Sequence, residues 1–294
     1  MRLAPALALL LALAAPVAGG AAPSAVLAST AGTYDFTVGT LRLTAINDGE
    51  TERPNDGKTF SPVEGVTRVL ATAALPTDKL KLSFGALLVH DGKRTVLIDS
   101  GTGPSMSPPG RLRVDLVEKG IAPASITDIV ISHPHFDHIG GLLTGDGKPA
   151  FPNARVHIWP QAWEELRAHS TPAMVAAIEP HLALIPADGR LTPHLRALAI
   201  PGHTPGHIGV EIASGRAKLL YVGDAMHHYV ASVAAPDLDM AYDADGAIAK
   251  ASRKALLARA ADQHLLLYVP HFPFPGLGHV VRDGASYAWV PVAR

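Results

Sequence analysis

The sequence predicts an α/β protein, in which β-strands and helices alternate through both halves of the chain. Short runs of β-branched and other apolar residues, such as 126–131 and 265–269, are typical of buried strands. Longer segments rich in Ala, Leu, Lys and Arg, such as 248–262, are typical of helices. Several predicted strands end in a histidine or an aspartate, so we expect the functional residues to lie at these strand ends.

Length and composition limit the classes of function. The chain has 294 residues, enough for one large domain or two small ones with an ample core. A formal net charge of −1, with both signs evenly mixed, gives no electrostatic footprint for nucleic acid. The chain has no cysteine, so any metal site must use carboxylates and the 15 histidines.

Residues 1–22 have the parts of a secretory signal peptide. Met1-Arg2 is charged, residues 3–15 are almost wholly Ala and Leu, and residues 17–22 are mostly small. The apolar stretch is short for a membrane span. We therefore expect cleavage, export to a bacterial periplasm or beyond, and a single domain over residues 23–294. An uncleaved membrane anchor is the alternative.

The secondary structure follows from hydrophobic periodicity and turn residues. The predicted strands are 36–38, 41–46, 82–89, 94–98, 126–131, 154–158, 197–200, 210–212, 218–222 and 265–269. The predicted helices are 66–74, 111–119, 161–169, 172–179 and 248–262. We expect a turn at 47–49, a polar loop at 50–62, and either Asp243 or Asp245 as the N-cap of the last helix.

The densest polar cluster follows the predicted strand at 126–131. If the backbone stays extended, His133, His135 and Asp137 point to one side, because alternate strand positions share a face. His138 then points elsewhere unless the chain turns, which the glycines at 140–141 make easy. Four such residues at a strand end predict ligands for two neighbouring metal ions. A chance run of surface histidines is the alternative.

Three later strands end in the same kinds of residue. His203 follows the strand at 197–200, Asp224 follows the strand at 218–222, and His271 follows the strand at 265–269. Asp224 is suited to bridge two ions because each of its oxygens can bind one. His207 is expected to be a hydrogen-bonded structural residue. The remaining isolated histidines are expected to be structural or exposed: His157, His169, His181 and His194.

These motifs resemble the metallo-β-lactamase superfamily. The pattern His133-x-His135-x-Asp137-His138 looks like its signature, and later motifs extend the likeness over most of the chain after about residue 36. The run 271–276, His-Phe-Pro-Phe-Pro-Gly, resembles the secreted methyl parathion hydrolase and lactonase-like branch. The resemblance implies a four-layer αβ/βα sandwich of two mixed β-sheets flanked by helices.

The resemblance also implies a role for each motif residue. One ion would be held by His133, His135 and His203, and the other by Asp137, His138 and His271. Asp224 would bridge them, which makes Asp137 and Asp224 the catalytic carboxylates. Asp99 and His207 would support the site from behind the ligands. Phe272 and Phe274 would line an apolar substrate pocket, with core packing as the alternative.

The implied function is that of an exported dinuclear metal-dependent hydrolase. Two cations would lower the pKa of a shared water toward about 7, and the bridging hydroxide would open a lactone or ester. Phosphotriester hydrolysis is a candidate side activity. Zinc suits this ligand set, which also admits iron, manganese or cobalt. The expected partner is a small molecule, without nucleic acid or stable membrane association after cleavage, and a homodimer is left open.

Three alternatives remain at this point. A mononuclear iron persulfide dioxygenase shares part of the histidine signature, but would leave Asp137 and His138 without an ion. A β-lactam hydrolase and a non-catalytic metal-binding protein are the others. One departure from the family pattern is Gly85, where relatives often carry an asparagine. The roles of His227, His228 and His279 are left open.

Overall fold

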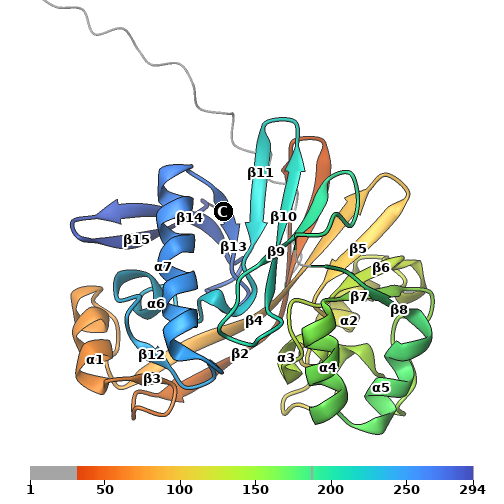
Figure 1. Cartoon of the computed structure of the whole chain (residues 1–294), viewed down its shortest axis with the longest axis horizontal. Helices are drawn as coiled ribbons and strands as arrows, with labels where there is room; N and C mark the ends of the chain where they lie inside the picture. The colour runs from red at the N-terminus through yellow and green to blue at the C-terminus, as the bar shows by residue number, and fades with distance from the viewer. Residues whose placement is uncertain (1–31, 187, 294) are drawn as a thin grey trace, which may run out of the picture.

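A computed structural model describes residues 32–186 and 188–293 (Figure 1). The expected leader at residues 1–22 lies outside these residues. In the part of the chain that is described, no helix is long and apolar enough to cross a membrane.

Two mixed β-sheets form the centre of the molecule. The first sheet has seven strands in the order β1-β2-β4-β5-β6-β7-β8. Its strands are β1 (Thr33–Val38), β2 (Leu41–Pro54), β4 (Lys79–Asp91), β5 (Arg94–Ile98), β6 (Asp128–Val130), β7 (Arg155–Ile158) and β8 (Leu182–Leu184). The second has six, in the order β15-β14-β13-β11-β10-β9. They are β9 (Leu195–Ala199), β10 (Ile208–Ser214), β11 (Ala217–Tyr221), β13 (Leu266–Tyr268), β14 (Leu277–Asp283) and β15 (Ser286–Pro291).

Helices cover the outer faces of both sheets (Figure 1). The α-helices are α1 (Val63–Thr72), α2 (Leu112–Glu118), α3 (Phe136–Ile139), α4 (Pro160–His169), α5 (Pro172–Ile178), α6 (Ala231–Ala234) and α7 (Gly246–Asp262). Short 3-10 turns are η1 (Pro123–Ser125), η2 (Gly140–Leu142), η3 (Glu179–His181) and η4 (Gly223–Ala225). A small two-stranded sheet joins β3 (Phe60–Ser61) to β12 (Asp239–Met240).

Separate apolar cores hold the layers together. The two sheets face each other across a core that includes Phe36, Leu87 and Val210. A second core lies between the first sheet and α2, α4 and α5, and a third lies between the second sheet and α7. Burial of these apolar surfaces is the main stabilising contribution to the fold. The four-layer αβ/βα arrangement predicted above is confirmed.

The first sheet differs from the prediction at β2. This strand does not turn at 47–49 but continues to Pro54 through a β-bulge between Asn47 and Gly49, and it pairs with β4 on both sides of the bulge. The residue at the bulge, Asp48, is buried and fully hydrogen-bonded. Asp48 accepts hydrogen bonds from the backbone N–H groups of Thr102 and Leu112 and from the Thr102 hydroxyl. The long β2–β4 ribbon therefore replaces the first part of the predicted polar loop.

Candidate metal centre

The candidate ligands lie at the carboxyl ends of strands from both sheets. His133 follows β6, whereas His203, Asp224 and His271 follow β9, β11 and β13. Since β6 belongs to the first sheet and the other three strands to the second, the site lies where the two sheets meet at one edge. Segments far apart in sequence are thereby brought together, as expected from their strand-end positions.

The segment that carries the signature is only partly extended. His135 has extended dihedral angles (φ −69°, ψ 152°), but helix α3 begins at Phe136. The expectation of an extended run through Asp137 was therefore wrong. The helical turn is what lets the neighbours Asp137 and His138 both reach the site, because the side chains no longer alternate between opposite faces.

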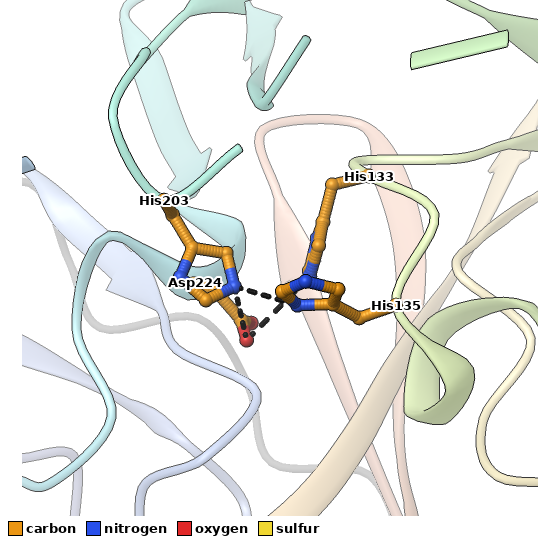
Figure 2. Close-up of side chains that lie close together, drawn as sticks. All are labelled: His133, His135, His203 and Asp224. Atoms are coloured by element: carbon orange, nitrogen blue, oxygen red, sulfur yellow. Dashed lines mark hydrogen bonds and ion pairs between the residues drawn. The ribbon is translucent and has the colours of Figure 1, made fainter. Parts of the chain in front are cut away.

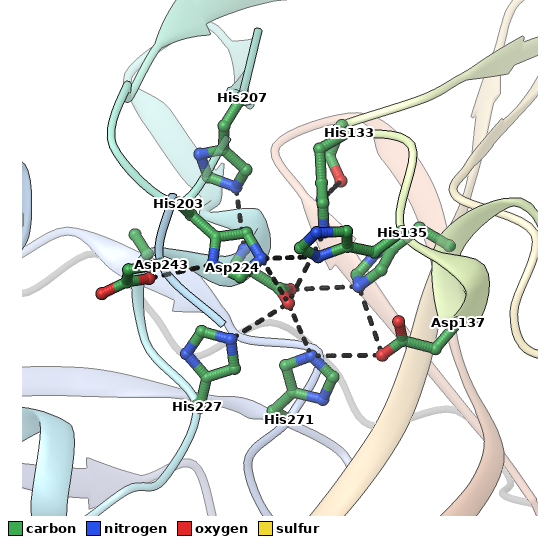
Figure 3. Close-up of polar contacts among 12 residues, drawn as sticks. His133, His135, Asp137, His203, His207, Asp224, His227, Asp243 and His271 are labelled. Atoms are coloured by element: carbon green, nitrogen blue, oxygen red, sulfur yellow. Dashed lines mark hydrogen bonds and ion pairs between the residues drawn. The ribbon is translucent and has the colours of Figure 1, made fainter. Parts of the chain in front are cut away.

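Two groups of side chains are each able to hold a metal ion. His133, His135, His203 and Asp224 form one group (Figure 2). Asp137, His138, Asp224 and His271 form the other, of which Asp137, Asp224 and His271 are labelled in Figure 3. Within each group the ligand atoms all lie within 4.8 Å of one another. The structure thus brings together every residue that the sequence analysis selected as a ligand, in the same two sets.

Asp224 is shared by the two groups. Its Oδ2 lies 3.3 Å from His203 Nε2 and 3.0 Å from His271 Nε2, and its Oδ1 lies 3.1 Å from His138 Nε2. Burial would raise the pKa of this carboxyl, but His138 and His271 hold it well below its ordinary value. Asp224 is therefore an ionised carboxylate at the centre of five imidazoles, where a bridging ligand would have to be.

Unpaired buried atoms show that this centre fits metal ions. In the described part of the chain, His133 Nε2, His138 Nε2 and Asp224 Oδ1 are buried and make no hydrogen bond of acceptable geometry. A buried polar atom left unsatisfied costs about 1–3 kcal/mol, so a cluster of them needs a further partner. Imidazole nitrogens and carboxylate oxygens are donors that zinc and related divalent ions accept. A pair of divalent cations would satisfy these atoms.

Asp99 supports the site from behind the ligands. Its carboxylate lies 2.7 Å from His138 Nδ1 and accepts hydrogen bonds from the Ser132 N–H and hydroxyl and from the Tyr221 hydroxyl. The bond to Nδ1 leaves His138 Nε2 directed at the site, which fixes the tautomer a ligand needs. Asp99 adopts a left-handed backbone conformation (φ 59°) to reach these partners.

His207 has the structural position expected for it. Its Nδ1 donates to the Ile200 carbonyl at 2.7 Å, and its Nε2 accepts from the Asp224 N–H at 2.8 Å. Burial lowers the pKa of His207 to about 3, so the ring is neutral and Nε2 can accept. Gly223 permits this contact, because a Cβ there would lie 2.4 Å from His207 Nε2.

Of the two candidate caps of the last helix, Asp245 is confirmed and Asp243 is not. The N-cap of α7 is Asp245, which accepts from two backbone N–H groups of the first turn. Asp243 instead accepts from His203 Nδ1 at 2.9 Å and pairs with Arg253 at 3.0 Å. Arg253 is 1% exposed and also donates to the carbonyls of residues 225, 236 and 238. Asp243 therefore orients a candidate ligand.

His227 is a further residue whose role the sequence left open. Its Nε2 lies 3.1 Å from Asp224 Oδ2, and its ring stacks on that of His271 at 5.2 Å (Figure 3). Neither of its ring nitrogens has a hydrogen-bond partner in the described part of the chain. Burial lowers the pKa of His227 to about 4, so the ring is neutral. Its spacing of three residues from Asp224, across one tight turn, was the available signal.

A cavity of about 440 Å³ opens above the ligand groups. Its walls combine candidate ligands with mostly apolar side chains, among them Leu82, Phe84, Met106, Phe136 and Tyr242. This volume is in the range of small-molecule sites.

The predicted substrate contacts of Phe272 and Phe274 are wrong. Neither lines the cavity. Phe272 packs in the third core, with its ring 4.9 Å from that of Trp289, and Phe274 packs against the core between the sheets.

The fold and the paired ligand groups are those of a metal-dependent hydrolase. Residues 86–271 match the metallo-beta-lactamase superfamily, and the chain belongs to that superfamily. Among solved structures, AidC, a dizinc quorum-quenching lactonase seen with a product, aligns with a TM-score of 0.82 and 30% identity over 90% of this chain and 98% of AidC. The hydrolase AbOPH aligns with a TM-score of 0.80 and 27% identity, over 91% of this chain and 99% of AbOPH.

Curated relatives match over shorter stretches. An N-acyl homoserine lactonase of Bacillus sp is 35% identical over 106 residues, which are 35% of this chain and 40% of that protein. A probable metallo-hydrolase of Mycobacterium bovis, Mb2322c, is 25% identical over 48% of this chain and 56% of its own length. The chain thus aligns with about half or less of each of these two relatives.

Proposed function

We propose that this chain is a dinuclear zinc-dependent hydrolase that opens lactones or cleaves esters. The observation that carries the proposal is the convergence of two ligand groups on one shared carboxylate, Asp224, at the floor of a cavity with apolar walls. Lactone opening is supported by the lactonases among its relatives. The complete second ligand group speaks against the mononuclear alternative, because Asp137, His138 and His271 are assembled beside the first.

The residues of the chain divide the work of such a reaction. When bound, two cations would polarise the scissile carbonyl and lower the pKa of a shared water. Asp224 would hold the two positions together, and Asp99 and Asp243 would fix the tautomers of His138 and His203. His227 would help to position Asp224, because its Nε2 lies 3.1 Å from Asp224 Oδ2. Leu82 and Phe84 would exclude water from the apolar part of the substrate.

An activity screen of zinc-loaded protein tests the proposal. The substrates are N-hexanoyl homoserine lactone, an aryl ester and the phosphotriester methyl parathion. Turnover of a lactone or ester that is lost on chelation and restored by zinc is the expected result, with the phosphotriester slower. Protein that holds two zinc ions and turns over neither lactones nor esters would contradict it.

We further propose export. It is supported by the charged, apolar and small-residue parts of residues 1–22. Expression with the leader in a bacterial host should give periplasmic protein that begins near residue 21 to 23. Intact Met1 on membrane-associated protein would favour the anchor instead.

A further inference from the structure

Arg53 is placed on the cavity side of the β2–β4 ribbon. In this antiparallel pair Thr51 lies opposite Leu82, and Arg53 lies opposite Leu80. Since directly opposed residues share a face and neighbours alternate, Arg53 is on the same face as Leu82. Thr51, Arg53 and Leu82 all line the cavity above the candidate metal centre. Among the described residues, Arg53 is the only arginine or lysine in that lining.

The charged residues that neighbour Arg53 on this ribbon are paired with each other on the opposite face. Glu50 contacts Lys81 at 2.6 Å, and Glu52 contacts Lys79 at 3.0 Å. Among the residues that the structure describes, none forms an ion pair with Arg53. The acidic residues that line the cavity are Asp137 and Asp224, both surrounded by the histidines of the candidate centre. Arg53 is thus exposed, lines the substrate space, and has no ion-pair partner in the described part of the chain.

An apolar surface separates Arg53 from the chemistry. Leu82, Phe84 and Met106 line the same cavity, whose floor is formed by candidate ligands. A substrate with its carbonyl at the floor would lay an apolar middle section along these side chains. Its far end would then reach the outer part of the ribbon, where a guanidinium offers a planar pair of donors suited to a carboxylate.

We propose that Arg53 determines specificity by binding a carboxylate at the far end of the substrate. The substrate class is then a lactone or ester with an apolar middle section and a distal carboxylate, in contrast to neutral acyl lactones. This inference rests on the proposed function. It requires no chemical step by Arg53, which acts on binding alone and should therefore change KM more than kcat.

Two esters of equal chain length test the inference. Mono-4-nitrophenyl adipate carries a distal carboxylate, and 4-nitrophenyl hexanoate ends in a methyl group. The quantity to compare is the ratio of kcat/KM for the adipate ester to kcat/KM for the hexanoate ester. This ratio should be above one in wild-type protein, and Arg53→Gln should lower it about tenfold, mainly through a higher KM for the adipate ester. Hexanoate turnover should stay within about twofold. The preference should also weaken in salt, because the contact is solvent-exposed.

Lys81→Gln is the matched control, because it removes one positive charge from the opposite face of the same ribbon. It should leave the ratio unchanged. A wild-type ratio near one, or an equal loss on both esters in Arg53→Gln, would overturn the inference. Calorimetric binding of adipate and hexanoate to zinc-loaded protein separates the two proposals. Failure to hydrolyse either ester counts against the proposed function, while tighter binding of adipate that Arg53→Gln abolishes still supports the role of Arg53.

Discussion

Replacing Asp243 by asparagine tests how the first ligand group is held. Asp243 Oδ1 lies 2.9 Å from His203 Nδ1, and its Oδ2 lies 3.0 Å from Arg253 Nη2. Asparagine has the same shape, but it has no charge and would present an N–H to either the imidazole or the guanidinium. Loss of a partner behind a ligand histidine typically lowers metal affinity 10–100-fold, or about 1.4–2.7 kcal/mol.

The same change also leaves Arg253 as a buried charge without a counterion. Removing one member of a buried pair costs about 3–5 kcal/mol of stability, and we expect the lower end because Arg253 keeps three carbonyl acceptors. The double variant Asp243→Asn, Arg253→Leu removes that unpaired charge. It should recover part of the stability but not the zinc affinity.

Zinc titration against a competing chelator measures these affinities site by site. Asp243→Asn should weaken one zinc and leave the other within about threefold. Asp245→Ala is the control, since Asp245 caps α7, and it should lose about 1 kcal/mol of stability with both zinc affinities unchanged. A folded Asp243→Asn or double variant that binds both ions as tightly as wild type would refute the reasoning.

Three further predictions concern Asp224 and His227 in the candidate metal centre and the buried carboxylate of Asp128. Asp224→Ala should lose zinc and lower the hydrolysis rate about a hundredfold or more. The rise of the rate from acid toward neutral pH should also be displaced. Normal zinc content with an unchanged pH–rate curve would contradict this prediction. His227→Ala should keep both zinc ions and lower kcat about tenfold, whereas loss of one zinc would make His227 a ligand. Burial raises the pKa of Asp128, but hydrogen bonds from His157 and Thr127 and the charge of Arg94 outweigh it and lower the pKa. Because the folded pKa lies below the ordinary value of 3.8, this stabilisation is present above that pH and is lost as pH falls through the folded pKa. Denaturant unfolding should therefore show a wild-type advantage over Asp128→Asn that is constant above about pH 5 and shrinks in more acid solution.

Much of the candidate centre could be predicted because its residues are marked locally. His133, His203, Asp224 and His271 each follow an apolar strand, and a strand end is visible in the sequence. The residues that hydrogen-bond to the candidate ligands from behind were harder to predict from the sequence. Asp99 was selected only through the family resemblance, and Asp243 looked like a cap because it precedes a helix. Its contact with His203 spans 40 residues, and nothing local marks it.

The fold shows the same division between local and distant causes. Helix α7 was predicted from a segment rich in Ala, Leu, Lys and Arg, and strand β5 from a short apolar run, so both have local causes. The continuation of β2 through residues 47–54 was not, because a polar sequence becomes a strand there only through pairing with β4 and the buried contacts of Asp48. Phe272 was ambiguous because an aromatic side chain beside a ligand suits a pocket or a core equally well, and only the packing partners decide.

The number of zinc ions per chain tests the central claim most directly. Elemental mass spectrometry of zinc-loaded wild-type protein should find close to two ions per chain, since two complete ligand groups share Asp224. His271→Ala should lower the number toward one while its circular dichroism stays that of wild type. A value near one in fully loaded wild-type protein would contradict the dinuclear centre.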